Sequence, residues 1–163
     1  MTKPVLSPIL AGLLLVVVNF RGHVFAEDKY GPSDPIAAID GKPIFLGELN
    51  LILTERVDPR DLGKIGIEIQ QATAALLVRR HLAMRALRQQ GGDSSEAMIR
   101  RQIESFASEA RRRGSGLAQQ AKARMADEKS LISDIAWRTA WSQYLKSRLN
   151  DENLRRYFDQ QRD

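Results

Sequence analysis

The chain offers few residues that could carry catalytic or metal chemistry. Its 163 residues include no cysteine and only two histidines, His23 and His81. These counts exclude a disulfide framework, a thiolate metal site, a cysteine nucleophile and a histidine-rich metal centre. The neighbours of His81 on a helix are arginines, which cannot orient it for catalysis, so we expect a structural or surface role. We therefore expect no catalytic residue, no metal and no cofactor.

Arginine is concentrated between residues 79 and 113, where nine arginines accompany four acidic residues. A basic run of this kind can bind nucleic-acid phosphates, so a basic helical nucleic-acid-binding protein is one alternative function. The run can also be a solvated helix face, partly paired with glutamates at i, i+4. We favour the solvated face because the N-terminus predicts export. Weak contact with an anionic membrane surface stays an alternative.

Aromatic residues form the third candidate feature. Trp137, Trp141 and Tyr144 fall at i, i+4 and i+7 and share one face of an expected helix. Such a stripe is usually core, but it can also line a groove for apolar segments of other chains. The two tryptophans cannot both be fully buried in so small a domain. With Tyr157 and Phe158 on the last expected helix, these five residues are the candidate client-binding groove.

The N-terminus has the pattern of a secretory signal peptide. Residues 1–26 contain no acidic side chain, and residues 5–18 are almost entirely apolar. Val24 and Ala26 suit the −3 and −1 positions of a cleavage between Ala26 and Glu27. A membrane anchor that stays uncleaved is the alternative, although a spanning helix needs about 20 apolar residues. We therefore expect export across the cytoplasmic membrane, with the periplasm as the destination.

The elements behind these residues predict a mainly α fold, a small orthogonal multi-helix domain with a short N-terminal β-hairpin. A flexible leader is expected at 27–35 and the domain itself at 36–163. Strands at 36–39 and 42–45 flank Asp40-Gly41, a dipeptide that favours the positive φ angles of a tight hairpin turn. We expect the hairpin and all later elements to form this one domain.

Helices are expected at 47–57, 67–90, 93–114, 117–124, 127–149 and 151–161. The break after residue 90 rests on Gly91-Gly92 and on Asp93-x-x-Glu96, which resembles a capping box. The helix at 67–90 has apolar residues on more than one face, so we expect it to be the central and most buried helix.

Several of these segments resemble the SurA/PrsA/PpiD-type exported folding factors. Residues 34–48 (DPIAAIDGKPIFLGE) resemble the family's opening segment, and residues 75–87 (ALLVRRHLAMRAL) are similar to its central helix. Residues 135–145 (IAWRTAWSQYL) resemble the closing helix, and residues 149–158 (LNDENLRRYF) the segment that leads into the catalytic part. The resemblance extends over nearly all of the chain after the signal.

The resemblance implies an ATP-independent chaperone domain that holds apolar segments of unfolded secreted or outer-membrane proteins. In that family a parvulin-type peptidyl-prolyl isomerase domain follows this module, whereas this chain ends at Asp163. No isomerase activity is therefore expected. The alternative is an N-terminal fragment or a degenerate copy of a peptidyl-prolyl cis-trans isomerase.

Overall fold

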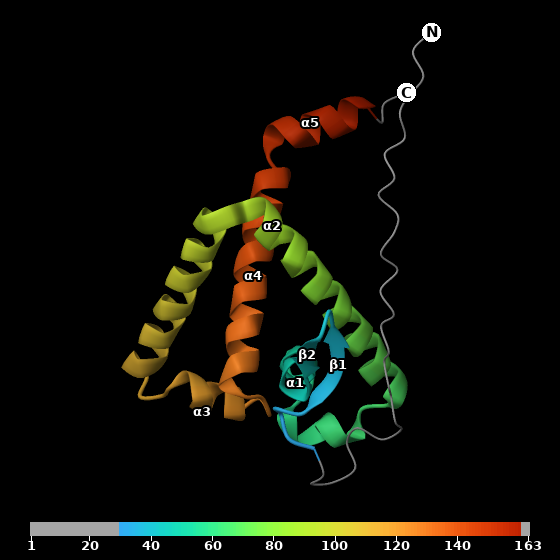
Figure 1. Cartoon of the computed structure of the whole chain (residues 1–163), viewed down its shortest axis with the longest axis vertical. Helices are drawn as coiled ribbons and strands as arrows, with labels where there is room; N and C mark the ends of the chain where they lie inside the picture. The colour runs from blue at the N-terminus through green and yellow to red at the C-terminus, as the bar shows by residue number, and fades with distance from the viewer. Residues whose placement is uncertain (1–29, 161–163) are drawn as a thin grey trace.

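A computed structural model describes residues 30–160, apart from the side chains of residues 92–94. The expected signal peptide lies outside the described residues. The elements, in chain order, are β1 (Pro35–Ile39), β2 (Lys42–Phe45), α1 (Leu46–Leu53), the 3-10 helix η1 (Pro59–Lys64), α2 (Ile67–Arg112), α3 (Leu117–Lys122), α4 (Glu128–Arg148) and α5 (Asp151–Gln160) (Figure 1). The expected fold class, mainly helical with a short N-terminal hairpin, is confirmed.

The hairpin forms where the turn chemistry predicts it. β1 and β2 pair antiparallel, and Ile39 lies opposite Lys42. Asp40 and Gly41 both have positive φ, 50° and 74°, as a two-residue hairpin turn requires. The expected leader, which precedes the hairpin, is hydrogen-bonded to the domain, because Gly47 N–H donates to the Pro32 carbonyl at 2.8 Å. The described residues of the leader are nearly all exposed, and hydrogen bonds join them to the start of α1.

The most buried helix is α1, not the helix that begins at Ile67. Seven of its eight residues are buried: Leu46, Gly47, Glu48, Leu49, Asn50, Leu51 and Leu53. It lies against the hairpin, α2 and α4. A Cβ added to Gly47 would lie 2.7 Å from the Ser130 hydroxyl, so the close approach of α1 to α4 requires glycine. The expectation that the helix after Ile67 is central was wrong, because its length leaves much of it in solvent.

The expected break at Gly91-Gly92 is a bend inside one helix. α2 is assigned continuously over 46 residues, but Figure 1 shows it folding back so that its two arms flank α4. A Cβ on Gly91 would lie 2.6 Å from the Cβ of Ser95, whereas Cβ atoms at i and i+4 are normally about 5–6 Å apart. Gly91 therefore permits a sharp bend. The expected end of one helix and start of another at this point was wrong, because α2 continues through it.

Three apolar clusters hold the elements together. The first joins the hairpin, α1 and the first arm of α2, and the second joins α1, α3, α4 and the second arm. In the third, Ile99 of the second arm packs on Ala136 and Ala140 of α4, with Met84 and Leu87 of the first arm beside them. Both arms of α2 thus meet on α4.

The last helix stands apart from this core. Asn150 caps α5, because its side-chain oxygen accepts a 2.8 Å hydrogen bond from Asn153 N–H. No residue of α5 is buried, and the helix projects from the end of α4 (Figure 1). α5 is therefore an appendage of the described domain.

Candidate functional site

A cleft of about 920 Å³ lies between the hairpin, both arms of α2 and the N-terminal half of α4. Its volume is within the range of about 300–1,000 Å³ that is typical of ligand-binding clefts. The apolar lining residues are Ile39, Pro43, Phe45, Leu77, Met84, Ile99, Ile103, Ile132, Ala136 and Trp137. The bend in α2 creates this space because it folds both arms back against α4.

The charged groups of the cleft leave an excess of positive charge. Each of its four carboxylates already has a cationic or imidazole partner that also lines the cleft: Asp40–Arg85, Glu48–His81, Glu96–Arg88 and Asp134–Arg80. Lys42, Arg100 and Lys129 line the cleft as well, and within the described part of the chain none of them forms a salt bridge, although Lys129 lies near Asp127 and favours its ionised form. An apolar ligand with acidic groups therefore suits this cleft best.

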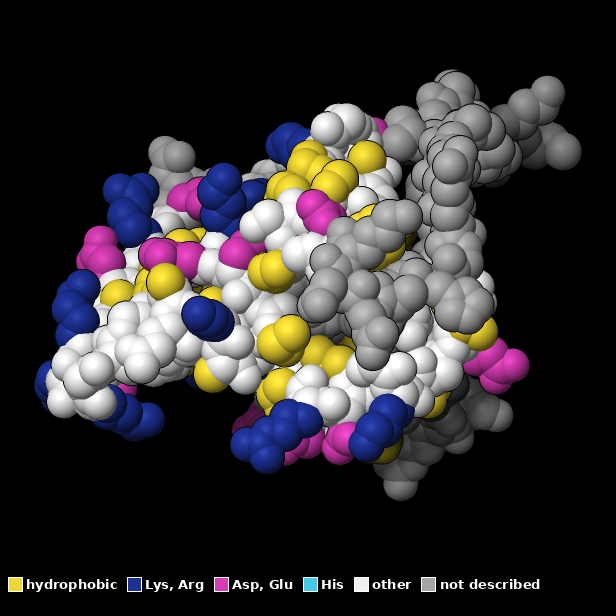
Figure 2. Space-filling model, turned by 90° about the horizontal axis from the view of Figure 1, so that it is seen from below, with side chains coloured by type: hydrophobic (Ala, Val, Ile, Leu, Met, Phe, Trp, Pro, Cys, Tyr) yellow, Lys and Arg dark blue, Asp and Glu magenta, His cyan; other side chains and the backbone are white. Residues whose placement is uncertain are grey.

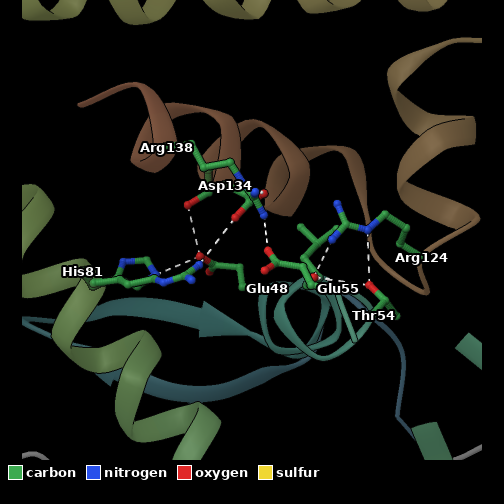
Figure 3. Close-up of polar contacts among 10 residues, drawn as sticks. Glu48, Thr54, Glu55, His81, Arg124, Asp134 and Arg138 are labelled. Atoms are coloured by element: carbon green, nitrogen blue, oxygen red, sulfur yellow. Dashed lines mark hydrogen bonds and ion pairs between the residues drawn. The ribbon is translucent and has the colours of Figure 1, made fainter. Parts of the chain in front are cut away.

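Glu48 is the buried polar centre of the cleft, and its residue is only 7% exposed. Its Oε2 accepts hydrogen bonds from His81 Nε2 at 2.8 Å and from the Ser133 hydroxyl at 3.1 Å. Phe45 N–H donates to its other oxygen at 3.3 Å. In Figure 3 the side chain of Glu48, on α1, and the side chain of His81, on α2, point toward each other. One carboxylate thus joins α1, α2 and α4.

This arrangement does not activate a nucleophile. Ser133 donates to the carboxylate, whereas nucleophilic catalysis requires the hydroxyl to contact the imidazole. His81 therefore contacts a carboxylate and not a hydroxyl. Sequence reasoning missed Glu48 as its partner, because the two residues are 33 positions apart and no local pattern links them.

A second set of polar contacts lies next to that of Glu48 and also involves α1. Arg138 bridges Asp134, at 2.7 Å, and Glu55 (Figure 3). Partial burial opposes its charge, but hydrogen bonds and the negative charge of both carboxylates raise the pKa of Arg138 above its already high value. Arg124 donates to the Thr54 hydroxyl at 3.2 Å and to the Leu51 carbonyl. These contacts join α1 to α4 and to the segment that follows α3.

The aromatic stripe forms a stacked ladder that begins in the cleft. The rings of Trp137 and Trp141 lie 5.3 Å apart, and those of Trp141 and Tyr144 lie 5.4 Å apart. Trp137 is half-buried, with the Arg80 guanidinium 5.7 Å from its ring centre, and Trp141 is 38% exposed. Neither tryptophan is fully buried, so the ladder is not core over its whole length. It continues the apolar cleft lining along α4.

The other two candidate residues lie elsewhere. Tyr157 and Phe158 contact each other edge to face, with 6.1 Å between ring centres. They are 59% and 67% exposed on α5, and no described ring contact joins them to the ladder. The five candidate residues therefore form two separate aromatic surfaces instead of one groove.

The arginine run is largely paired. Arg80, Arg85, Arg88, Arg112 and Arg113 all form ion pairs with carboxylates. Figure 2 shows Lys and Arg side chains next to Asp and Glu side chains on the face that it presents. Five of the nine arginines between residues 79 and 113 are thus paired, which is the kind of contact that the solvated-face interpretation predicts.

Three comparisons bear on the identity of the site. No protein-family model matches the chain, and neither a curated protein nor a solved structure is significantly similar to it. Among residues 30–160 no cluster of metal-ligating side chains occurs, and no helix there is long and apolar enough to cross a bilayer. Any function must therefore be argued from the cleft itself.

Proposed function

We propose that this protein is an exported, ATP-independent chaperone module that holds apolar segments of unfolded secreted or outer-membrane proteins. The observation that supports this most is the apolar cleft that continues as the partly exposed ladder of Trp137, Trp141 and Tyr144. Aromatic side chains provide large contact area with little conformational entropy to lose, which suits binding of varied sequences.

The charge of the cleft refines the class of client. Because Lys42, Arg100 and Lys129 form no ion pair within the described residues, an apolar segment flanked by Asp or Glu gains favourable contacts. A segment flanked by Lys or Arg is repelled by the same groups. We therefore expect a preference for acidic flanks that weakens as salt is added.

The proposal is tested by measuring suppression of aggregation of a denatured outer-membrane protein. Trp141→Ala is expected to leave the unfolding midpoint nearly unchanged and to weaken client binding by about 1–2 kcal/mol. The double variant R100E/K129E is expected to weaken binding of an acidic-flanked apolar peptide more than binding of its lysine-flanked counterpart. Arg111→Glu, on an exposed part of α2 outside the cleft lining, is the matched control.

Two outcomes would contradict the proposal. If the parent chain does not suppress aggregation, the holding function is wrong. If Trp141→Ala lowers stability and client protection in proportion, the ladder stabilises the fold and does not bind clients.

A further inference from the structure

We propose that α5 of a second copy of this chain occupies the cleft, and that reciprocal exchange of α5 forms a two-fold symmetric dimer. This inference goes beyond the proposed function and does not require that clients bind. It rests on two features of the same chain, an apolar cleft with excess positive charge and a projecting helix with an apolar face.

The apolar face of α5 is largely exposed among the described residues. Leu154, Tyr157 and Phe158 are 38%, 59% and 67% exposed, and no residue of the helix is buried. A ten-residue helix with a strongly amphipathic pattern is seldom stable in water unless its apolar face is covered. The helix therefore needs a covering surface.

The cleft of the same chain is out of reach. α5 is connected to α4 only through Leu149 and Asn150, and its ten residues extend about 15 Å. The residues of α4 that line the cleft run from Lys129 to Trp137, and Trp137 lies roughly 16 Å below the end of α4. Folded back along α4, α5 would cover the aromatic ladder and reach only the edge of the cleft. A helix in the cleft must come from another chain.

The charges of α5 complement those of the cleft. Asp151 and Asp159 form no ion pair with any described residue, and neither does Arg155, whereas Glu152 is paired with Arg156 at 2.7 Å. The helix therefore carries three carboxylates and two guanidiniums, a small excess of negative charge. Asp151 lies one turn before Leu154, on the same face of the helix. The cleft offers unpaired cations and an apolar floor, so α5 supplies both the apolar side chains and the carboxylates that the cleft lacks.

Exchange in both directions closes the assembly. When each chain places α5 in the other's cleft, both apolar faces are covered and a closed two-fold dimer results instead of an open polymer. The short connection at Leu149 and Asn150 is the hinge, and Leu149 is itself 60% exposed, so it does not restrain the helix through packing.

The first experiment measures the mass of the full chain by light scattering as a function of concentration. We expect a dimer that the double variant Y157A/F158A weakens by at least about tenfold, because aromatic anchors dominate such interfaces. Arg111→Glu is the control outside the interface. A chain that stays monomeric into the millimolar range, or a dimer that Y157A/F158A does not weaken, would overturn the proposal.

The contact between the carboxylates of α5 and the cations of the cleft is tested by reversing the charges on one side and then on both. D151K/D159K is expected to weaken the dimer, and adding R100E/K129E in the same chain is expected to restore it. Circular dichroism confirms that each variant is folded. Failure of the second pair of changes to restore the dimer would overturn the placement of α5 in this cleft.

Crosslinking identifies which chain supplies the helix. Because the chain has no cysteine, Met84→Cys in the cleft and Phe158→Cys on α5 can be placed in separate chains and mixed. A disulfide between the two chains is expected under mild oxidation. Ser108→Cys, exposed on α2 outside the cleft lining, replaces Met84→Cys in the control mixture. If a single chain carrying both cysteines crosslinks only to itself at high concentration, the helix binds within its own chain and the proposal is wrong.

Discussion

Asp127 shows how one side chain positions the start of α4. Its Oδ1 accepts from Ser130 N–H at 2.7 Å, which caps the helix, and its Oδ2 accepts from the Ser33 hydroxyl at 2.7 Å. Burial on its own would raise the pKa of this carboxyl, but the hydrogen bonds and the nearby Lys129 together lower it below its ordinary value. The folded state therefore favours the ionised carboxylate.

This pKa direction predicts a pH-dependent share of the stability. A carboxyl with a lowered pKa in the folded state contributes stability above its ordinary pKa of 3.8, and the contribution is lost as pH falls through the lower folded-state pKa. Asp127→Asn keeps a capping oxygen but does not titrate. We expect the difference in unfolding free energy between the parent and this variant to be largest above pH 4 and to shrink below it.

Urea unfolding at several pH values measures this difference. Asp127→Ala, which removes the cap as well, is expected to lower the unfolding free energy by about 0.5–2 kcal/mol at neutral pH. A gap between the parent and Asp127→Asn that stays constant down to pH 2 would contradict the role of the charge.

Met125 carries backbone strain next to the same cap. Its φ is 54°, in the left-handed region that disfavours side chains with a Cβ, and its carbonyl accepts from the buried Asn50 amide at 2.7 Å. The Met125 residue is 54% exposed, so little packing is lost when its side chain is removed.

Met125→Gly is therefore expected to raise the unfolding free energy, by up to about 1 kcal/mol after the extra entropy of the unfolded chain is subtracted. Met98→Gly, at an exposed position inside α2, is the matched control and should lower it by about 1 kcal/mol. Denaturant titration compares the two. Equal destabilisation by both variants would show that Met125 is not strained.

At the scale of elements, the bend of α2 determines whether a cleft exists. Gly91 lets the Ser95 side chain approach, and the two arms can then pack on the same helix, α4. A helix continuing straight through this point would carry its second arm away from the third apolar cluster. The bend is thus required by tertiary packing and permitted by one glycine.

Gly91→Ala tests this requirement. Alanine is a better helix former than glycine by about 1 kcal/mol, yet its Cβ would lie 2.6 Å from the Ser95 Cβ. We expect net destabilisation of about 1–3 kcal/mol, typical of overpacking. Gly63→Ala, where a Cβ meets nothing within 4 Å, is the control and should change stability little. The combination G91A/S95G should restore stability, and failure to do so would place the strain elsewhere.

At the scale of the molecule, a packed body and a projecting helix respond differently to mutation. Ile135 is 7% exposed in the second apolar cluster, whereas Leu154 is 38% exposed on α5. Ile135→Ala should lower the unfolding free energy by about 2–5 kcal/mol. Leu154→Ala should change it by less than about 0.5 kcal/mol in dilute, monomeric protein. A comparable loss in both would show that α5 belongs to the cooperative core.

The export prediction also concerns the whole molecule and rests on residues outside the described structure. Expressed in a bacterial host, the protein is expected to have an N-terminus at Glu27, as determined by N-terminal sequencing. Full-length protein recovered from the cytosol would contradict export. A full-length form in the membrane fraction would indicate the uncleaved anchor instead.

Local chemistry determined much of this protein from the sequence. The Asp40-Gly41 turn and the periodic apolar faces act over a few residues, so the hairpin, α4 and α5 could be predicted with nearly correct bounds. The stripe of Trp137, Trp141 and Tyr144 was visible for the same reason, because helical spacing places these residues on one face.

Only the tertiary structure decided which of these surfaces meet. The contact between Glu48 and His81 spans 33 positions, and the burial of α1 depends on neighbours from α2 and α4. The continuity of α2 through Gly91 was likewise set by packing, because backbone hydrogen bonds and the third apolar cluster outweigh the local preference of two glycines for a break. The spacing of residues along a helix determines which side chains share a face. The free energy of burial, however, depends on contacts between segments that are distant in the sequence. The cleft, and the separation of Tyr157 and Phe158 from the aromatic ladder, therefore arise only when those segments pack together.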